Sequence, residues 1–136
     1  MNRASRYGDV ALWIRAVYRA GFGVRLITSV IRPGDRSDSA NPRTIPLGME
    51  IPVRFIRRAG DQNAGIPPEF FDDDGTSVIV TECLVRRIKD LTLTDLIGMA
   101  PDTATPELVR YHIGTLYDIE LPDDEFLVTI WRFRYV

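Results

Sequence analysis

Few side chains in this sequence are suited to catalysis, because it has one histidine, His112, and one cysteine, Cys83. A Ser-His-Asp or Cys-His arrangement would need His112, but this residue falls within a helical pattern that explains it as a packing or rim position. Cys83 lies in a predicted buried strand, where a lone cysteine acts as a small apolar residue. A Cys/His zinc site would lack ligands, and nucleotide-binding glycine motifs are absent. We therefore predict no catalytic residue, no metal and no cofactor.

Arginine is the abundant functional residue, and it is concentrated in the first part of the chain. Residues 1–58 hold 11 arginines and 4 acidic residues, a formal charge of +7. Residues 59–136 hold 5 arginines, one lysine and 15 acidic residues, a charge of −9. Because guanidinium groups match phosphate and stack on bases, this asymmetry favours a polyanion-binding surface. The alternative is that arginines of the first part pair with acids of the second in the folded protein.

Seven arginines fall on two predicted strands and the loop between them. If they share one face, they form a groove that binds phosphates with salt-sensitive affinity, and neighbouring aromatic residues offer stacking surfaces. The seven are Arg25, Arg32, Arg36, Arg43, Arg54, Arg57 and Arg58.

The elements that must position these arginines follow from hydrophobic periodicity. Residues 5–20 are predicted to be a helix, from apolar residues spaced three and four apart. The β-branched stretch 24–31 predicts a strand, which Pro33-Gly34 would end. Residues 35–46 are rich in Ser, Asp, Asn and Pro and predict an exposed loop. Residues 48–58 alternate in polarity and predict a half-buried strand.

The rest of the chain predicts two further strands and two helices. Thr92 and Asp95 resemble a capping box, and Thr105-Pro106 is a helix start signal. The strands are expected at 76–88 and 125–136, with a loop at 59–75 and an acidic turn at 118–124. This order predicts an α+β fold with a small, largely antiparallel sheet.

The size and composition fit one domain spanning residues 1–136. A chain of 15.4 kDa with 45% hydrophobic residues can bury about two-thirds of its surface without metals or disulfides. The apolar runs are short, and arginines interrupt the first thirty residues. We therefore expect no membrane-spanning helix and no signal peptide, and we expect a cytoplasmic protein.

Several stretches resemble an ASCH domain, a relative of the PUA-like β-barrels that are associated with RNA. Arg87-Ile88-Lys89-Asp90-Leu91-Thr92, with Asp95-Leu96 after it, resembles the end of a family strand and the start of a helix. Leu127-Val128-Thr129-Ile130-Trp131-Arg132-Phe133 resembles the final strand, and Leu47-Gly48-Met49-Glu50-Ile51 a Gly-acid turn. The similarity spans residues 10–136 and implies a PUA-like, largely antiparallel β-barrel with flanking helices.

The family signature, Gly-x-Lys followed after four residues by Arg, is matched here in part. Gly23-Val24-Arg25 has an arginine where the signature has a lysine. Thr28 occupies a position where many family members have threonine, and Val30 occupies the position of the signature's arginine. Some bacterial members hydrolyse acetylated cytidine with a lysine, a threonine and a glutamate. Arginine stays protonated and cannot serve as a neutral base, and the place of the glutamate falls near Met99. The resemblance therefore does not extend to that activity.

These observations predict a module that binds RNA or a nucleotide-like ligand in a cleft between the barrel and the helices, without catalysis. Its binding residues would be Arg25, Thr28, Arg32, Arg36 and Arg43. One alternative is a hydrolase, of amidohydrolase or nuclease type, acting on a modified nucleoside or on RNA. It would need Glu82, Asp102 or another acid in one pocket with Thr28 and Arg25. Another alternative is a protein-interaction module that uses the acidic second part or the final strand.

Overall fold

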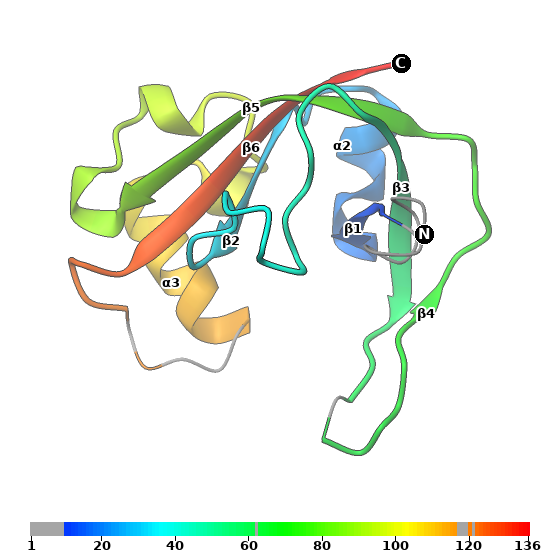
Figure 1. The fold of residues 1–136 in the computed structure, drawn as a ribbon, viewed down its shortest axis with the longest axis horizontal. Coiled ribbons are helices and arrows are strands. Elements are labelled where there is room, and N and C mark those ends of the chain that lie inside the picture. The colour runs from blue at the N-terminus through cyan, green and yellow to red at the C-terminus, as the bar shows by residue number, and fades with distance from the viewer. Residues whose placement is uncertain (1–9, 62, 117–119, 121) are drawn as a thin grey trace.

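Six strands form one sheet in the computed structural model, which describes residues 10–61, 63–116, 120 and 122–136. The strand order is β1-β3-β5-β6-β2, with β4 paired to β3 (Figure 1). β1 runs parallel to β3, and the other pairs are antiparallel. The strands are β1 (Leu12–Arg15), β2 (Ser29–Pro33), β3 (Glu50–Arg58), β4 (Glu69–Phe70), β5 (Ser77–Arg87) and β6 (Leu127–Tyr135).

In the described part of the chain, two α-helices and several 3-10 turns accompany the sheet, so the predicted α+β class is confirmed. The α-helices are α2 (Arg19–Gly23) and α3 (Pro106–Leu116). The 3-10 turns are η1 (Ala16–Tyr18), η2 (Ile88–Asp90), η3 (Thr94–Leu96) and η4 (Pro101–Thr103). α3 begins at the predicted signal, where Thr105 Oγ1 accepts a hydrogen bond from the Leu108 N–H at 3.2 Å.

β6 is buried on both faces because it separates two hydrophobic cores. Val128 and Ile130 pack with the core beneath α3, whereas Trp131 and Phe133 pack with the core that contains Phe22 of α2. The two helices lie on different parts of the curved sheet in Figure 1. The alternation predicted for the last strand is confirmed, and its two sides face two different cores.

The helix predicted for residues 5–20 is wrong at residues 12–15, whereas η1 and the start of α2 are helical over residues 16–20. Residues 12–15 form β1, in which buried Leu12 and Ile14 alternate with exposed Trp13 and Arg15. This is the period of a strand, and the apolar Val17, which follows in η1, is 74% exposed and does not extend a buried helical face. The parallel partner strand β3, some forty residues away, stabilises β1. Residues 5–9, with the predicted caps Ser5 and Asp9, lie outside the described residues.

The strand predicted for 24–31 begins later, at Ser29, because the chain first has to leave α2. Arg25 adopts a left-handed conformation with φ of 59°, and its N–H donates to the Phe22 carbonyl at 3.0 Å. Left-handed backbone at a helix end is more usual for glycine. Arg25 therefore belongs to the turn that ends α2 and does not lie on a strand.

The helix predicted after Thr92 is only the single 3-10 turn η3. The capping box itself forms, since the Asp95 N–H donates to Thr92 Oγ1 at 3.2 Å and the Thr92 N–H donates to Asp95 Oδ2 at 3.1 Å. The turn stops at Gly98, whose φ of 84° favours glycine and whose α-carbon packs against Thr28.

The predicted barrel is not closed. β1 and β2 are the two ends of the strand order, and no backbone ladder joins them among the described residues. Their contact is a side-chain bridge, in which Arg32 Nη2 on β2 donates to the Trp13 carbonyl on β1 at 2.9 Å. The gap between these two strands is where the candidate site lies.

Candidate ligand-binding site

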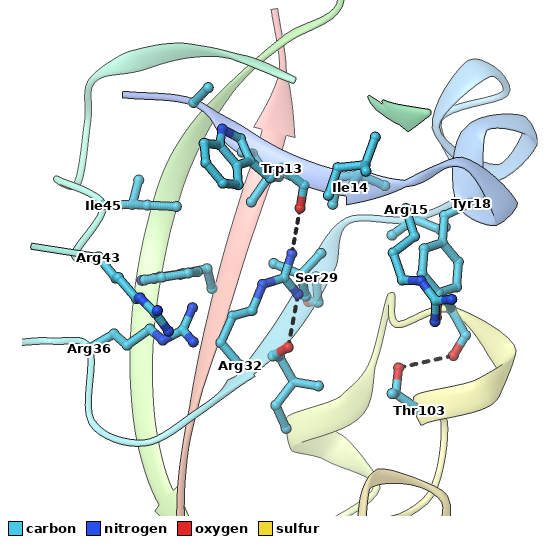
Figure 2. A pocket seen from close by; sticks show the side chains of 18 of the residues that line it. Trp13, Ile14, Arg15, Tyr18, Ser29, Arg32, Arg36, Arg43, Ile45 and Thr103 are labelled. Carbon is cyan, nitrogen blue, oxygen red and sulfur yellow. Dashed lines mark hydrogen bonds between the residues drawn. The ribbon is translucent and has the colours of Figure 1, made fainter. Parts of the chain in front are cut away.

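A cavity of about 590 Å³ lies beside the opening between β1 and β2. Its walls come from these strands, from the loop 35–46, and from η1, η4 and α3 (Figure 2). The loop was predicted to be exposed, but Arg36, Thr44 and Ile45 within it are buried. The reason is that the loop folds back over the cavity as one of its walls.

Four arginines line this cavity, and Asp102 is the one acidic residue among the described lining residues. Figure 2 shows Arg36 and Arg43 pointing toward one another on one side, Arg15 next to Tyr18 on the other, and Arg32 between them. Four guanidinium groups against one carboxylate give the cavity a net positive lining, which favours an anionic ligand.

Hydrogen bonds to neutral carbonyl groups hold two of these arginines in place. Arg32 donates to the carbonyls of Ile31 and Trp13, both at 2.9 Å, and Arg36 Nε donates to the Pro33 carbonyl at 3.2 Å. A neutral carbonyl orients a guanidinium group without cancelling its charge. The two bonds of Arg32 use two of its five N–H groups, so it keeps donors for a ligand.

Thr129 on β6 fixes the backbone that leads into Arg36. Its Oγ1 accepts from the Arg36 N–H at 2.9 Å and donates to the Gly34 carbonyl at 2.7 Å. Thr129 is fully buried, so water cannot replace these bonds at the hydroxyl. The position of Arg36 therefore depends on a threonine from the opposite end of the sequence.

The structure brings together three of the five predicted binding residues, Arg32, Arg36 and Arg43. Arg25 lies outside the cavity, with its guanidinium carbon 5.4 Å from the ring centre of Tyr135. Thr28 lines a second, smaller pocket of about 260 Å³. Of the signature residues Arg25, Thr28 and Val30, only the apolar Val30 lines the arginine cavity.

Other predicted arginines are engaged elsewhere. Arg57 and Arg58 pair with Glu69, at 3.0 and 3.8 Å, as the alternative interpretation of the charge asymmetry requires. Arg54 lies on the outer side of β3, with its guanidinium carbon 4.1 Å from the centre of the Phe70 ring. The predicted clustering of positive charge therefore holds for the arginines that line the cavity, but not for Arg57 and Arg58, which pair with an acidic residue.

Among the described lining residues, neither Glu82 nor Asp102 shares a pocket with both Thr28 and Arg25, as the hydrolase alternative requires. Asp102 lines the large cavity, but Arg25 and Thr28 do not. Glu82 pairs instead with Arg132, at 3.5 Å. Cys83 is half-buried, and burial raises the pKa of its thiol, which disfavours the reactive thiolate.

A polar cluster at the Arg15 end of the cavity was not predicted from the sequence. The Tyr18 hydroxyl donates to Asp102 Oδ2, and His112 Nδ1 lies 3.6 Å from the same oxygen. Burial, reinforced by the bond to Asp102, raises the pKa of Tyr18. No spacing signal links these residues, because they come from η1, η4 and α3, and Arg15 was assigned to the edge of a helix.

The stability of the protein should fall as the pH drops from about 7 to about 5. Burial lowers the pKa of His112 below its ordinary 6.5, although Asp102 acts in the opposite direction. The unfolded chain therefore takes up a proton on His112 at a higher pH than the folded chain, which favours unfolding below pH 6.5. His112 is the only histidine. Urea unfolding at several pH values measures the free energy of unfolding. This free energy should fall with decreasing pH in the wild type and fall less in His112→Gln. An equal pH dependence in the two proteins would contradict a lowered pKa of His112.

The fold is similar to that of two solved structures. The DUF984 protein EF3133 from Enterococcus faecalis superposes with a TM-score of 0.55 at 12% identity, covering 93% of this chain and 79% of that chain. An ASCH domain from Lactobacillus crispatus superposes with a TM-score of 0.55 at 6% identity, covering 99% of this chain and 86% of that one. The chain therefore has an ASCH-type fold, as the sequence resemblance predicts.

At the level of the amino-acid sequence, no family model and no curated protein matches the chain. Within the described ranges, no helix is long and apolar enough to cross a membrane.

Proposed function

We propose that the cavity between β1 and β2 binds the phosphate groups of RNA or of a nucleotide-like ligand. The observation that carries this proposal is the set of four arginines around one cavity that contains a single carboxylate, Asp102, among its described lining residues. Guanidinium groups bind phosphate through paired, charge-assisted hydrogen bonds. A cytoplasmic location, where such ligands are abundant, is part of the same proposal.

The dimensions and chemistry of the cavity support a ligand of this class. A volume of about 590 Å³ lies within the range of pockets that hold small molecules and cofactors. Apolar residues such as Ile14 and Ile45 share the lining with the arginines. A nucleotide, with a charged phosphate and a flat apolar base, has both of the matching parts. The proposed role is binding, because Asp102, the acid that lines the cavity, is separated from Arg25 and Thr28, which the hydrolase alternative requires beside it.

Arg43→Ala should weaken binding of a short, fluorescently labelled single-stranded RNA by about 10- to 100-fold, since a charge-assisted hydrogen bond contributes about 1.5–3 kcal/mol. Arg43 is exposed, so its replacement should leave the fold intact. Fluorescence anisotropy measures the affinity.

The matched control is Arg134→Ala, which removes the same charge from an exposed position on β6 that does not line the cavity. We expect this variant to bind as the wild type does. Equal affinities for Arg43→Ala and the wild type would contradict the proposed function, as would equal losses in both variants.

A further inference from the structure

Three side chains form a patch on the outer side of the sheet, next to the cavity. Trp13 on β1 is in register with Arg54 on β3, so both point away from the core that holds Leu12. Phe70 on β4 joins them, with its ring centre 5.2 Å from that of Trp13. We name Trp13, Arg54 and Phe70 the aromatic patch.

Trp13 is unusually accessible for its type. Its side chain is 48% exposed, although tryptophan is among the most buried residues on average. The Trp13 and Phe70 rings are inclined at 63° and do not stack on one another. Arg54 covers Phe70, with its guanidinium carbon 4.1 Å from the ring centre, and adds positive charge beside the indole. The patch thus offers an aromatic surface beside a cation.

The aromatic patch and the arginine cavity are physically joined at Trp13. Trp13 lines the cavity, and its carbonyl accepts the hydrogen bond from Arg32 Nη2 at 2.9 Å. A phosphate held by Arg32 would therefore lie close to the backbone that carries the indole. Bases of an unpaired strand stack on aromatic side chains while basic residues hold the strand's phosphates.

We propose that Trp13 is a stacking platform for an unpaired base of single-stranded RNA whose neighbouring phosphates bind in the arginine cavity. The proposal rests on the proposed function and extends it, because it defines the ligand as a strand of at least two nucleotides. A mononucleotide would occupy the cavity without reaching the patch. A duplex would present its phosphates but keep its bases paired.

The test compares the affinity of Trp13→Ala for a labelled single-stranded hexanucleotide, a duplex of the same sequence and a mononucleotide. Stacking predicts that binding of the single strand weakens by about 5- to 100-fold, while binding of the duplex and the mononucleotide is unchanged. Trp13→Phe should restore most of the affinity, since it keeps an aromatic ring. Tyr111→Ala, which removes an aromatic residue on α3 that is still more exposed than Trp13, should have no effect.

The two proposals fail in different ways. If Arg43→Ala weakens binding of the single strand and Trp13→Ala does not, the cavity binds phosphate and the stacking role of Trp13 is wrong. If the wild type binds none of the three ligands, both proposals are wrong. An equal loss of affinity for all three ligands in Trp13→Ala would also contradict stacking, because it would indicate damage to the cavity itself. Thermal unfolding of Trp13→Phe and Trp13→Ala checks that both fold.

Discussion

Phe22→Ala is expected to lower the free energy of unfolding by about 3–5 kcal/mol, the usual cost of removing a buried phenylalanine. Phe22 is 2% exposed and stacks on Phe133, with ring centres 5.7 Å apart and an interplanar angle of 13°. Phe55 and Tyr135 meet the same ring edge-on, at 5.8 and 6.1 Å. Phe22 is also the one buried residue of α2, so it anchors this helix to the sheet.

Urea unfolding followed by circular dichroism measures the effect. The control is Val17→Ala, at a nearby position in η1 that is 74% exposed, and we expect a change within about 0.5 kcal/mol there. Because domains of this size are stable by only about 5–15 kcal/mol, the Phe22 variant should be partly unfolded at moderate temperature. A loss below 1 kcal/mol would contradict the central place of Phe22 in this core.

Thr129→Val is expected to cost about 2–4 kcal/mol, although the two side chains have nearly the same shape. The substitution removes the hydroxyl that accepts from the Arg36 N–H and donates to the Gly34 carbonyl. Leaving a buried polar group without a partner costs about 1–3 kcal/mol. The same change releases the backbone of Arg36, so binding of RNA should weaken as well.

Two further variants isolate the hydroxyl of Thr129. Thr129→Ser keeps both hydrogen bonds and should retain RNA affinity. Thr81→Val removes a hydroxyl that donates to the Arg132 carbonyl at an exposed position, where water can take its place, and should cost less than about 1 kcal/mol. Equal stability of Thr129→Val and the wild type would mean that these two bonds do not hold the turn.

The long elements were predictable because their own residues specify them. β5 and β6 lie within the two strands predicted at 76–88 and 125–136, and α3 follows the start signal Thr105-Pro106. β1 was missed because it has only four residues and depends on the parallel strand β3, a pairing that local periodicity cannot reveal. The open sheet involves the same element, since Arg32 links β1 to β2 by a hydrogen bond and no ladder joins the two strands within the described part of the chain.

The candidate site was predictable only in the part that depends on charge. Clustering along the sequence pointed to seven arginines, of which Arg32, Arg36 and Arg43 line the cavity. Arg25 belonged to both the cluster and the motif, but the turn that ends α2 takes it elsewhere. Asp102 and His112 belong to the site only because η4 and α3 pack near β1, and this tertiary contact has no local signal.

The salt dependence of RNA binding tests the phosphate-binding role of the cavity most directly. Anisotropy titrations of a labelled single strand, from about 50 to about 200 mM salt, give the slope of log affinity against log salt concentration. We predict a linear decrease for the wild type and, for Arg43→Ala, a slope smaller by about 0.7, the value of one lost phosphate contact. An affinity that does not change with salt, or no binding at the lowest salt concentration, would contradict phosphate recognition by these arginines.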